Sequence, residues 1–293
     1  MPFRPEQLLT FDDGADAALR LADRLGIPCD RIEVHTFPDD ERRVRVPPGG
    51  RHVAIYRPLD RPNAKLIELL LAASALRDGG VIDLCLIAPY LPYMRQDIAF
   101  RPGEAVSQAV VGGLLADAFD RFVAVDPHLH RTPDLSSVFR GKPALTLAAA
   151  PALAHYIDDK AVVIGPDEES EVLVRAIAAP GHQTWMVARK ERRGDRDVHM
   201  TLPDEPSLSG RRVAIVDDMI TSGTTIMTLA GLARQRSAMS IDVYVTHALY
   251  DEDVARAFTG AGIGRVVSCD GVPHPSNGIS LAETIATGLK QWQ

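Results

Sequence analysis

Short apolar runs alternate along the chain with longer segments in which apolar residues recur at helical spacing. In the first half, the strand-like runs are residues 52–56 (HVAIY), 81–88 (VIDLCLIA) and 121–126 (RFVAVD). Helical patterns separate them at Asn63–Arg77, with Asn63 as a candidate N-cap, and at Glu104–Phe119. This alternation predicts βαβ units and a mainly parallel sheet, so the expected fold class is α/β.

The second half repeats the alternation. Its strand-like runs are residues 161–165, 184–189, 211–218 and 241–249, and its helical patterns are Glu168–Ala179, Gly223–Gln235, Asp251–Gly260 and Leu281–Gln291. Between the halves, residues 138–151 carry few signals of either kind. We therefore expect two domains, 1–145 and 146–293, each with a mainly parallel sheet flanked by helices.

Composition and charge narrow the function classes. The 293 residues are 46% hydrophobic and 24% charged, which is typical of a globular protein. The net charge of −7 disfavours a general nucleic-acid binder, so an anionic ligand has to be met by a local cluster of bases. No run approaches 18 uncharged apolar residues and the start lacks a continuous apolar segment, so we expect neither a membrane span nor secretion. Three widely spaced cysteines, Cys29, Cys85 and Cys269, predict reduced thiols and a cytoplasmic location.

The segment Val213–Thr225 (VAIVDDMITSGTT) carries the most informative chemistry. An apolar strand reaches the paired acids Asp217 and Asp218, and a run of small hydroxyl residues around Gly223 then opens a helix. Gly allows close backbone approach, and the N–H groups and dipole of the helix favour a phosphate. The paired acids are acceptors for the vicinal hydroxyls of a sugar. A sugar phosphate satisfies both ends, whereas the simpler alternative is an ordinary Thr/Ser helix cap.

Two further segments are rich in polar chemistry. Residues 190–197 (KERRGDRD) follow a strand directly, which predicts a mobile charged loop, or simply a solvated charged hairpin. Arg95 and Gln96 follow the apolar run 81–88, where they present a planar cation and an amide, or form an exposed polar loop. His128 and His130 are also compatible with a transition-metal pair, although no third ligand has a recognisable spacing.

Taken together in chain order, these segments resemble a known family. Residues 213–225 resemble the phosphoribosyl-binding loop of the type I phosphoribosyltransferase fold. The further segments resemble motifs of the ribose-phosphate diphosphokinase (phosphoribosyl pyrophosphate synthetase) family: FPDDE at 37–41, PYLPYMRQD at 89–97, VDPHLHR at 125–131, GPDEES at 165–170 and KER at 190–192. The resemblance implies two tandem type I phosphoribosyltransferase-like domains, one holding ATP-binding elements and the other the ribose 5-phosphate loop.

The resemblance also implies a role for each matching residue. Catalytic cations are Lys190 and Arg192, and metal-associated residues are His128 and Asp167 near Mg²⁺ or its waters. ATP-binding residues are Phe37, Asp39, Glu41, Arg95 and Gln96, with the first three supplied by a neighbouring subunit of a homo-oligomer. Ribose-5-phosphate-binding residues are Asp217, Asp218, Thr221, Ser222, Gly223, Thr224 and Thr225.

The implied reaction transfers the diphosphoryl group of ATP to ribose 5-phosphate, giving 5-phosphoribosyl 1-diphosphate and AMP. Three departures from the family pattern place the chain in a divergent branch: Asp40 replaces the Gly before Glu41, Ile98 replaces a base after the RQD triplet, and Glu169 replaces the Gly of PDxG. The phosphate loop is also of the shorter form. Two alternatives remain: a phosphoribosyltransferase that acts on a base, and a catalytically silent relative that regulates an active synthetase.

Overall fold

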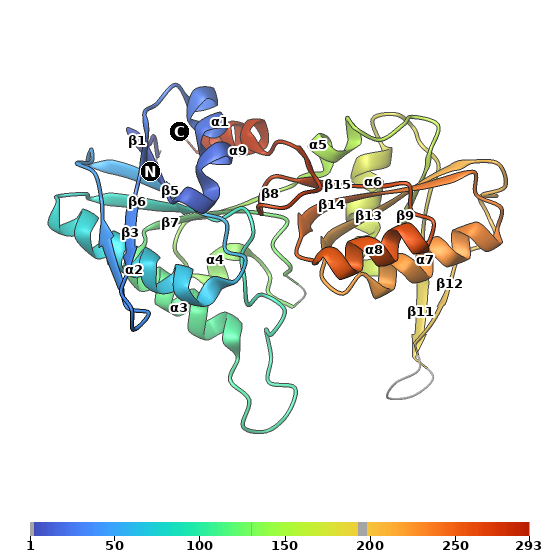
Figure 1. Cartoon of the computed structure of the whole chain (residues 1–293), viewed down its shortest axis with the longest axis horizontal. Coiled ribbons are helices and arrows are strands. Elements are labelled where there is room, and N and C mark those ends of the chain that lie inside the picture. Colours follow the sequence, from blue (N-terminus) through green and yellow to red (C-terminus); the bar gives the residue numbers. More distant parts are fainter. Residues whose placement is uncertain (1–2, 130, 193–197, 293) are drawn as a thin grey trace. The chain divides into compact units, whose positions relative to one another are not determined.

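The chain folds into two compact units, each built on its own parallel sheet (Figure 1). The computed structural model describes residues 3–129, 131–192 and 198–292. The first unit comprises Met1–Ala148, Gly271–Pro273 and Ser280–Gln293, and the second comprises Ala149–Asp270 and His274–Ile279. The C-terminal segment therefore belongs to the first unit, whereas the sequence pattern assigned it to the second domain.

The first unit contains a six-stranded sheet, a separate hairpin and flanking helices. Its strands are β1 (Gln7–Thr10), β2 (Cys29–Arg31), β3 (Glu33–Thr36), β4 (Arg42–Arg45), β5 (His52–Tyr56), β6 (Asp83–Ile87), β7 (Arg121–Val125) and β8 (Ala144–Leu147). Its helices are η1 (Asp12–Gly14), α1 (Ala15–Leu25), α2 (Pro62–Asp78), α3 (Ser107–Ala118), α4 (Leu135–Val138) and α9 (Ala282–Gln291). The sheet order is β2-β1-β5-β6-β7-β8, with every neighbouring pair parallel.

The second unit has the same plan. Its strands are β9 (Val162–Gly165), β10 (Trp185–Val187), β11 (Arg189–Arg192), β12 (Val198–Thr201), β13 (Arg212–Ile220), β14 (Ser240–Ala248), β15 (Arg265–Cys269) and β16 (Asn277–Ile279). Its helices are α5 (Ala150–Ala154), η2 (Glu168–Ser170), α6 (Glu171–Ala178), α7 (Thr224–Gln235) and α8 (Glu252–Gly260). The sheet order is β10-β9-β13-β14-β15-β16, again all parallel.

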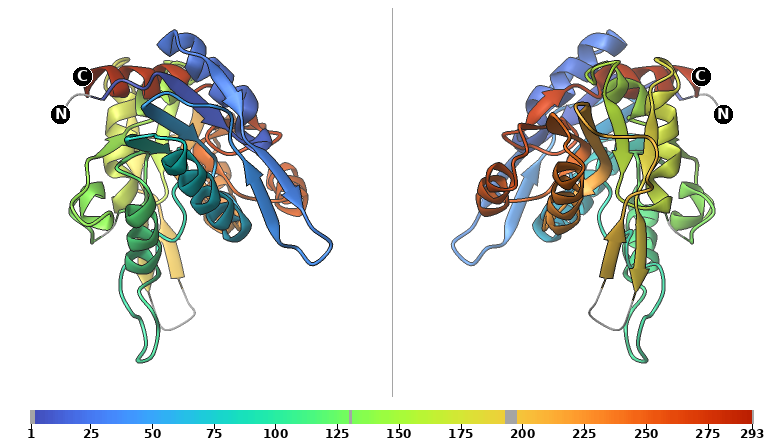
Figure 2. Two further views of the ribbon diagram at one scale, coloured as in Figure 1. Left: turned by 90° about the vertical axis from the view of Figure 1, so that its left-hand side faces the viewer. Right: turned by 90° about the vertical axis from the view of Figure 1, so that its right-hand side faces the viewer.

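The two sheets share one topology. In each unit the second strand lies on one side of the first, an antiparallel hairpin follows (β3–β4 or β11–β12), and the next strand lies on the other side of the first. Figure 2 shows both hairpins extending away from their sheets. The strand order therefore reverses between β1 and β5, and between β9 and β13. Ligands of open α/β sheets bind at the carboxyl ends of the strands that flank such a reversal.

Burial explains why apolar runs predict strands such as β5 and β9. Parallel strands are covered on both faces, so they read as continuous apolar segments. All but one residue of β5 and all of β9 are buried, and each sheet has its own hydrophobic core. The predicted strand at 52–56 coincides with β5, and the predicted helix Gly223–Gln235 begins one residue before α7. All three cysteines are free, and Cys85 and Cys269 are buried.

Some local predictions are wrong. Asn63 does not cap α2, because Arg61 occupies the N-cap position with a left-handed backbone and Pro62 begins the helix. Residues 190–192 are not a loop, since they belong to β11.

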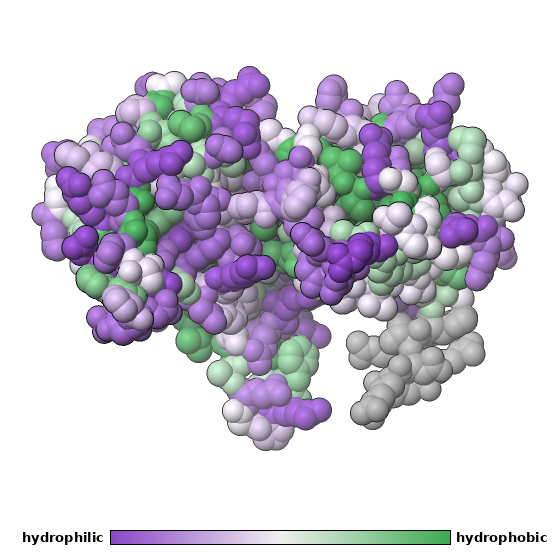
Figure 3. Space-filling model, in the orientation of Figure 1, coloured by the Kyte–Doolittle hydropathy of each residue, from purple (hydrophilic) through white to green (hydrophobic). Residues whose placement is uncertain are grey.

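The molecular surface and the helices bear on the membrane question. Hydrophilic residues cover most of the face drawn in Figure 3. Within the described part of the chain, no helix is both long enough and apolar enough to cross a bilayer.

Candidate active site

Carboxylates gather where β9 and β13 end in the second unit. β13 pairs with β9 only as far as Ile215, opposite Ile164, but it pairs with β14 as far as Ile220. Asp217 and Asp218 therefore lie in the part of β13 that extends past β9, inside the strand rather than after its end. Asp167 follows the end of β9 by two residues. The reversal of strand order thus brings acids from two strands to one edge of the sheet.

The surroundings of Asp217 raise its pKa. Burial, the neighbouring Asp218 and the charge of Asp167 together raise the pKa of Asp217 well above its ordinary value. The N–H of Asp218 donates to Asp217 Oδ1 at 3.0 Å, which opposes the shift only in part. A carboxyl group in this state gains from a cation or from hydroxyl donors, so the edge is suited to a polyhydroxyl ligand or a metal ion.

Asp167 is held in place by its own turn and contacts the basic hairpin. Its carboxylate accepts from the N–H of Ser170, and Ser170 Oγ donates to the Asp167 carbonyl at 2.5 Å, which caps η2. Lys190 Nζ lies 2.5 Å from Asp167 Oδ2. The fold therefore brings Lys190 on β11 and Asp167 after β9 together.

Gly165 and Ser170 shape the turn that holds Asp167, and neither was predicted as a site residue. A Cβ on Gly165 would lie 2.1 Å from Ser170 Oγ, so this position requires glycine. The GPDEES spacing could have indicated both residues.

The loop between β13 and α7 has the geometry of an anion cradle. Gly223 has φ +69° at the N-cap of α7. A Cβ there would lie 2.7 Å from both the Phe258 ring and Val254 of α8, so glycine is required by conformation and by space. Thr221, Ser222 and Thr224 are exposed, and Thr225 is partly buried. Hydroxyl donors therefore surround the N-terminus of a helix of 12 residues.

Part of the basic segment lies outside the described residues. The backbone of Arg192 pairs with Val198 in the β11–β12 hairpin, but its side chain is not described. Arg193 and Arg196, which the sequence analysis grouped with it, fall in 193–197 and are not described either.

The ATP-binding candidates lie in the first unit, on two separate segments. Phe37, Asp39 and Glu41 belong to the tip of the β3–β4 hairpin, which we name the FPDDE turn (residues 37–41). The Phe37 N–H donates to the Glu41 carbonyl at 2.9 Å, and the Glu41 N–H donates to Asp39 Oδ1 at 3.3 Å. All three side chains are exposed, so the turn is free to meet a ligand or another subunit.

The second segment lies between β6 and α3. Arg95 is exposed, whereas Gln96 is partly buried. Ser107 Oγ donates to Gln96 Oε1 at 2.5 Å, and the Gln108 N–H donates to the Gln96 carbonyl at 3.2 Å. Gln96 Oε1 thus accepts a hydrogen bond from the first turn of α3, while the side chain of Arg95 is exposed.

His128 lies in the first unit, after β7, and Asp167 lies in the second. Three residues after His128, Arg131 donates its N–H and its guanidinium to the carboxylate of Asp97, whose side chain is 2% exposed. Burial opposes the charge of Asp97, but these hydrogen bonds prevail and lower its pKa. His130 lies outside the described residues. Among the residues described, no group of three His, Cys, Asp or Glu forms a metal site by itself.

The three sequence departures have different structural consequences. Asp40 has φ +71°, the left-handed conformation in which glycine is normal, so the turn keeps its geometry with a different residue. Glu169 lies in the 3₁₀ helix η2, where a glycine conformation is not needed. Ile98 is 38% exposed in the segment after Gln96, and nothing in the structure explains it.

A solved structure shares this architecture over nearly the whole chain. The phosphoribosylpyrophosphate synthetase from Mycobacterium smegmatis superposes with a TM-score of 0.81, covering 97% of this chain and 98% of that one at 24% sequence identity. The chain is thus a protein of two tandem type I phosphoribosyltransferase-like domains, as the sequence analysis predicted.

Sequence comparisons place it more narrowly. Residues 7–118 match the N-terminal domain of ribose phosphate pyrophosphokinase, and residues 200–287 match the phosphoribosyl synthetase-associated domain. A ribose-phosphate pyrophosphokinase of Methanopyrus kandleri is 31% identical over 292 residues, which cover 97% of this chain and 98% of the relative. Another, from Methanothermobacter thermautotrophicus, is 32% identical over 278 residues, covering 93% and 96%. The chain belongs to the ribose-phosphate pyrophosphokinase family.

Proposed function

We propose that the chain is a ribose-phosphate diphosphokinase that makes 5-phosphoribosyl 1-diphosphate and AMP from ATP and ribose 5-phosphate. One observation carries this proposal: the acids of β13 are followed directly in the chain by the loop before α7, in which Gly223 is required. A sugar phosphate has hydroxyls at one end and an anion at the other, which matches this order of acceptors and donors.

The sugar phosphate is held by two groups of residues. Asp217 and Asp218 accept hydrogen bonds from the ribose hydroxyls, which relieves the unfavourable crowding of their charges. The five residues Thr221–Thr225 bind the 5-phosphate through hydroxyls, backbone N–H groups and the α7 dipole. The anomeric oxygen then bonds to the β-phosphorus of ATP as the bond from that phosphorus to the AMP oxygen breaks, and the hydroxyl proton is lost to solvent.

Mg²⁺ fits this site. The raised pKa of Asp217 reflects carboxylates that a divalent cation would neutralise. Mg²⁺ is often bound by one or two protein groups together with waters and phosphate oxygens. Asp167 and His128 are the residues that would hold it or its waters, and the ion would supply charge neutralisation to the phosphates.

Lys190 and Arg192 supply the protein's own cations. Lys190 is positioned beside the carboxylate edge through its contact with Asp167, so its ammonium is close to where the transferring group carries charge. Such a group stabilises a phosphoryl-transfer transition state by electrostatics and positioning. Arg95 and Gln96 hold ATP, together with Phe37, Asp39 and Glu41 from a neighbouring subunit of a homo-oligomer.

The test is an AMP-forming assay with ATP, ribose 5-phosphate and Mg²⁺, run on the full chain and on Lys190→Ala. We expect AMP formation that depends on the sugar phosphate, and a loss of about 10²–10³-fold in turnover for the variant. Lys160→Ala is the matched control, since Lys160 is exposed in the same unit and precedes the amino end of β9, whereas Asp167 follows the carboxyl end of that strand. Full turnover by Lys190→Ala would remove this residue from the mechanism, and absence of AMP with every sugar phosphate would contradict the proposed function.

A further inference from the structure

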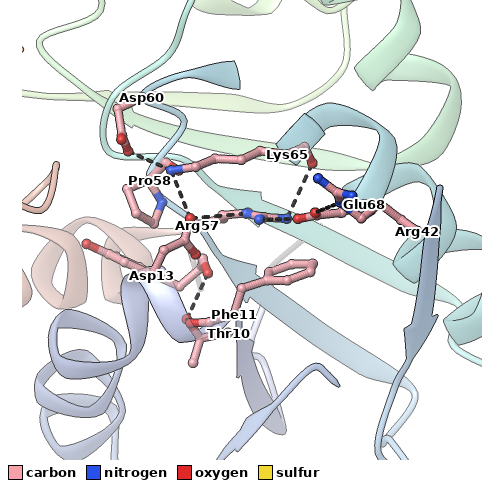
Figure 4. Close-up of polar contacts among 10 residues, drawn as sticks. Thr10, Phe11, Asp13, Arg42, Arg57, Pro58, Asp60, Lys65 and Glu68 are labelled. Atoms are coloured by element: carbon pink, nitrogen blue, oxygen red, sulfur yellow. Dashed lines mark hydrogen bonds and ion pairs between the residues drawn. The ribbon is translucent and has the colours of Figure 1, made fainter. Parts of the chain in front are cut away.

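Arg42 connects the FPDDE turn to helix α2. It is the first residue of β4, and its guanidinium Nη1 donates to both the carbonyl (2.8 Å) and the carboxylate (2.7 Å) of Asp40. Its Nε donates to Glu68 Oε1 at 3.0 Å. The side chain of Arg42 is 16% exposed and that of Glu68 is 9% exposed. A single guanidinium therefore ties the tip of a protruding hairpin to the body of the unit. Figure 4 shows the side chain of Arg42 meeting that of Glu68.

The residue that Arg42 holds is the one whose backbone needs support. Asp40 has φ +71°, a conformation that disfavours residues with a Cβ. Arg42 contacts the carbonyl and the carboxylate of Asp40 together, so it favours the left-handed backbone conformation of Asp40 over other backbone conformations. The hydrogen bond to Asp40 also raises the pKa of Arg42, while burial opposes the shift, so the guanidinium stays charged.

Glu68 is itself fixed from the core side. Arg57 donates to Glu68 Oε2, and its guanidinium lies 3.6 Å from the centre of the Phe11 ring. The Arg57 side chain is 5% exposed, so Glu68 has little freedom to turn away from it. Val44 lies on the same face of β4 as Arg42 and packs against the hydrophobic core, which gives the hairpin a second anchor.

The cluster in Figure 4 positions the hairpin rather than binding a ligand of its own. Lys65 pairs with Asp13 at 2.8 Å and with Asp60 at 2.7 Å, and Arg57 pairs with Glu68. The cations of the cluster thus face carboxylates of the same chain. An incoming anion would have to displace these ion pairs, whereas holding the hairpin in place requires no change in them.

We propose that Arg42, oriented by Glu68, is a positioning residue for the ATP site, because it fixes the FPDDE turn in the conformation that presents Phe37, Asp39 and Glu41. The inference rests on the proposed function, in which these three side chains bind ATP. It also explains how this chain uses Asp40 where its motif normally has glycine.

The test compares Arg42→Met with Arg45→Met. Met keeps the apolar stem but removes the clamp, and leaves the Arg57–Glu68 pair intact. We expect Arg42→Met to raise the KM for ATP by about five- to tenfold, with kcat and the KM for ribose 5-phosphate within about twofold. Arg45 is the matched control, because it lies on the same strand, its side chain is 78% exposed, and it pairs across the hairpin with Glu33 at 3.2 Å.

A second substitution tests the stated cause. Glycine adopts a positive φ without support, so Asp40→Gly added to Arg42→Met should return the KM for ATP to within about threefold of wild type. An unchanged KM for ATP in Arg42→Met, an equal rise in the KM for both substrates, or no recovery with Asp40→Gly would overturn the inference.

Binding of Mg·ATP, measured by calorimetry, separates this inference from the proposed function. If the wild-type chain binds ATP but forms no AMP, the proposed function is wrong, and the comparison of Arg42→Met with Arg45→Met still decides the positioning role. Equal ATP affinity in these two variants would then overturn it.

Discussion

Asp217 shows how function and stability conflict at one residue. Burial and the two nearby carboxylates raise its pKa, so its charged form destabilises the folded chain. An acid whose folded-state pKa is raised contributes most to stability at low pH, and this contribution is lost as pH rises through the folded-state pKa. The ammonium of Lys190, by contrast, has a carboxylate partner in Asp167.

Asp217→Asn should therefore stabilise the protein while impairing sugar binding. We expect the free energy of unfolding at neutral pH to rise, because the substitution removes a buried charge beside two other carboxylates, and the gain to grow with pH above about 4, where the carboxyl group of the unfolded chain ionises. Urea unfolding at several pH values measures it, and the KM for ribose 5-phosphate reports the lost acceptor. Asp23→Asn, at an exposed position of α1, is the control. A variant that is less stable than wild type from pH 5 to pH 8 would contradict the prediction.

At the scale of elements, each unit places its chemistry on strand ends and on the hairpin after its second strand. β11 brings Lys190 to Asp167, and the β3–β4 hairpin carries the FPDDE turn. The conformation of the loop before α7 depends on helix α8, because α8 leaves no room for a side chain at Gly223. The cradle is therefore shaped by the packing of two helices as well as by its own residues.

Gly223→Ala should cost about 2–4 kcal/mol of stability, from the positive φ and from overlap with Phe258 and Val254. Ribose 5-phosphate binding should weaken as well, because the loop has to shift. Gly231→Ala in the same helix is the matched control: a Cβ there meets nothing within 4 Å, so the substitution should stabilise by up to about 1 kcal/mol. Denaturant unfolding of both variants checks the contrast, and equal effects would refute the steric argument.

At the scale of the whole molecule, the chain is two copies of one topology with a C-terminal helix that returns to the first. Helix α9 packs on α1 and β8, and a Cβ on Gly288 would lie 2.4 Å from Leu147. Ile285 is 1% exposed. The first unit therefore requires residues from both ends of the chain.

Ile285→Ala should destabilise the first unit by about 2–5 kcal/mol, the usual range for such a cavity. Hydrogen exchange should show faster exchange in α1 and β1 than in wild type, with smaller changes in β13 and β14. Ile67→Ala, at a position 52% exposed on α2, should have a much smaller effect. Equal acceleration in both units would show that α9 stabilises the molecule in another way.

The sequence by itself determined the strands of both sheets wherever burial on both faces produced a continuous apolar run, as in β5, β9 and β13. It also indicated the acids of β13 and the glycine–hydroxyl loop, because their chemistry lies within one short segment. It did not reveal β3 and β4, since neither strand has a continuous buried run and their residues are polar or charged except for one valine each.

Only the tertiary structure decided which distant residues meet. The pairing of Lys190 with Asp167, the clamp from Arg42 to Glu68 and the return of α9 to the first unit join residues 23, 26 and more than a hundred positions apart. Local patterns of polarity carry no information about such contacts, because strand order and helix packing set them. The candidate site residues were readable one segment at a time, but their arrangement depended on the fold.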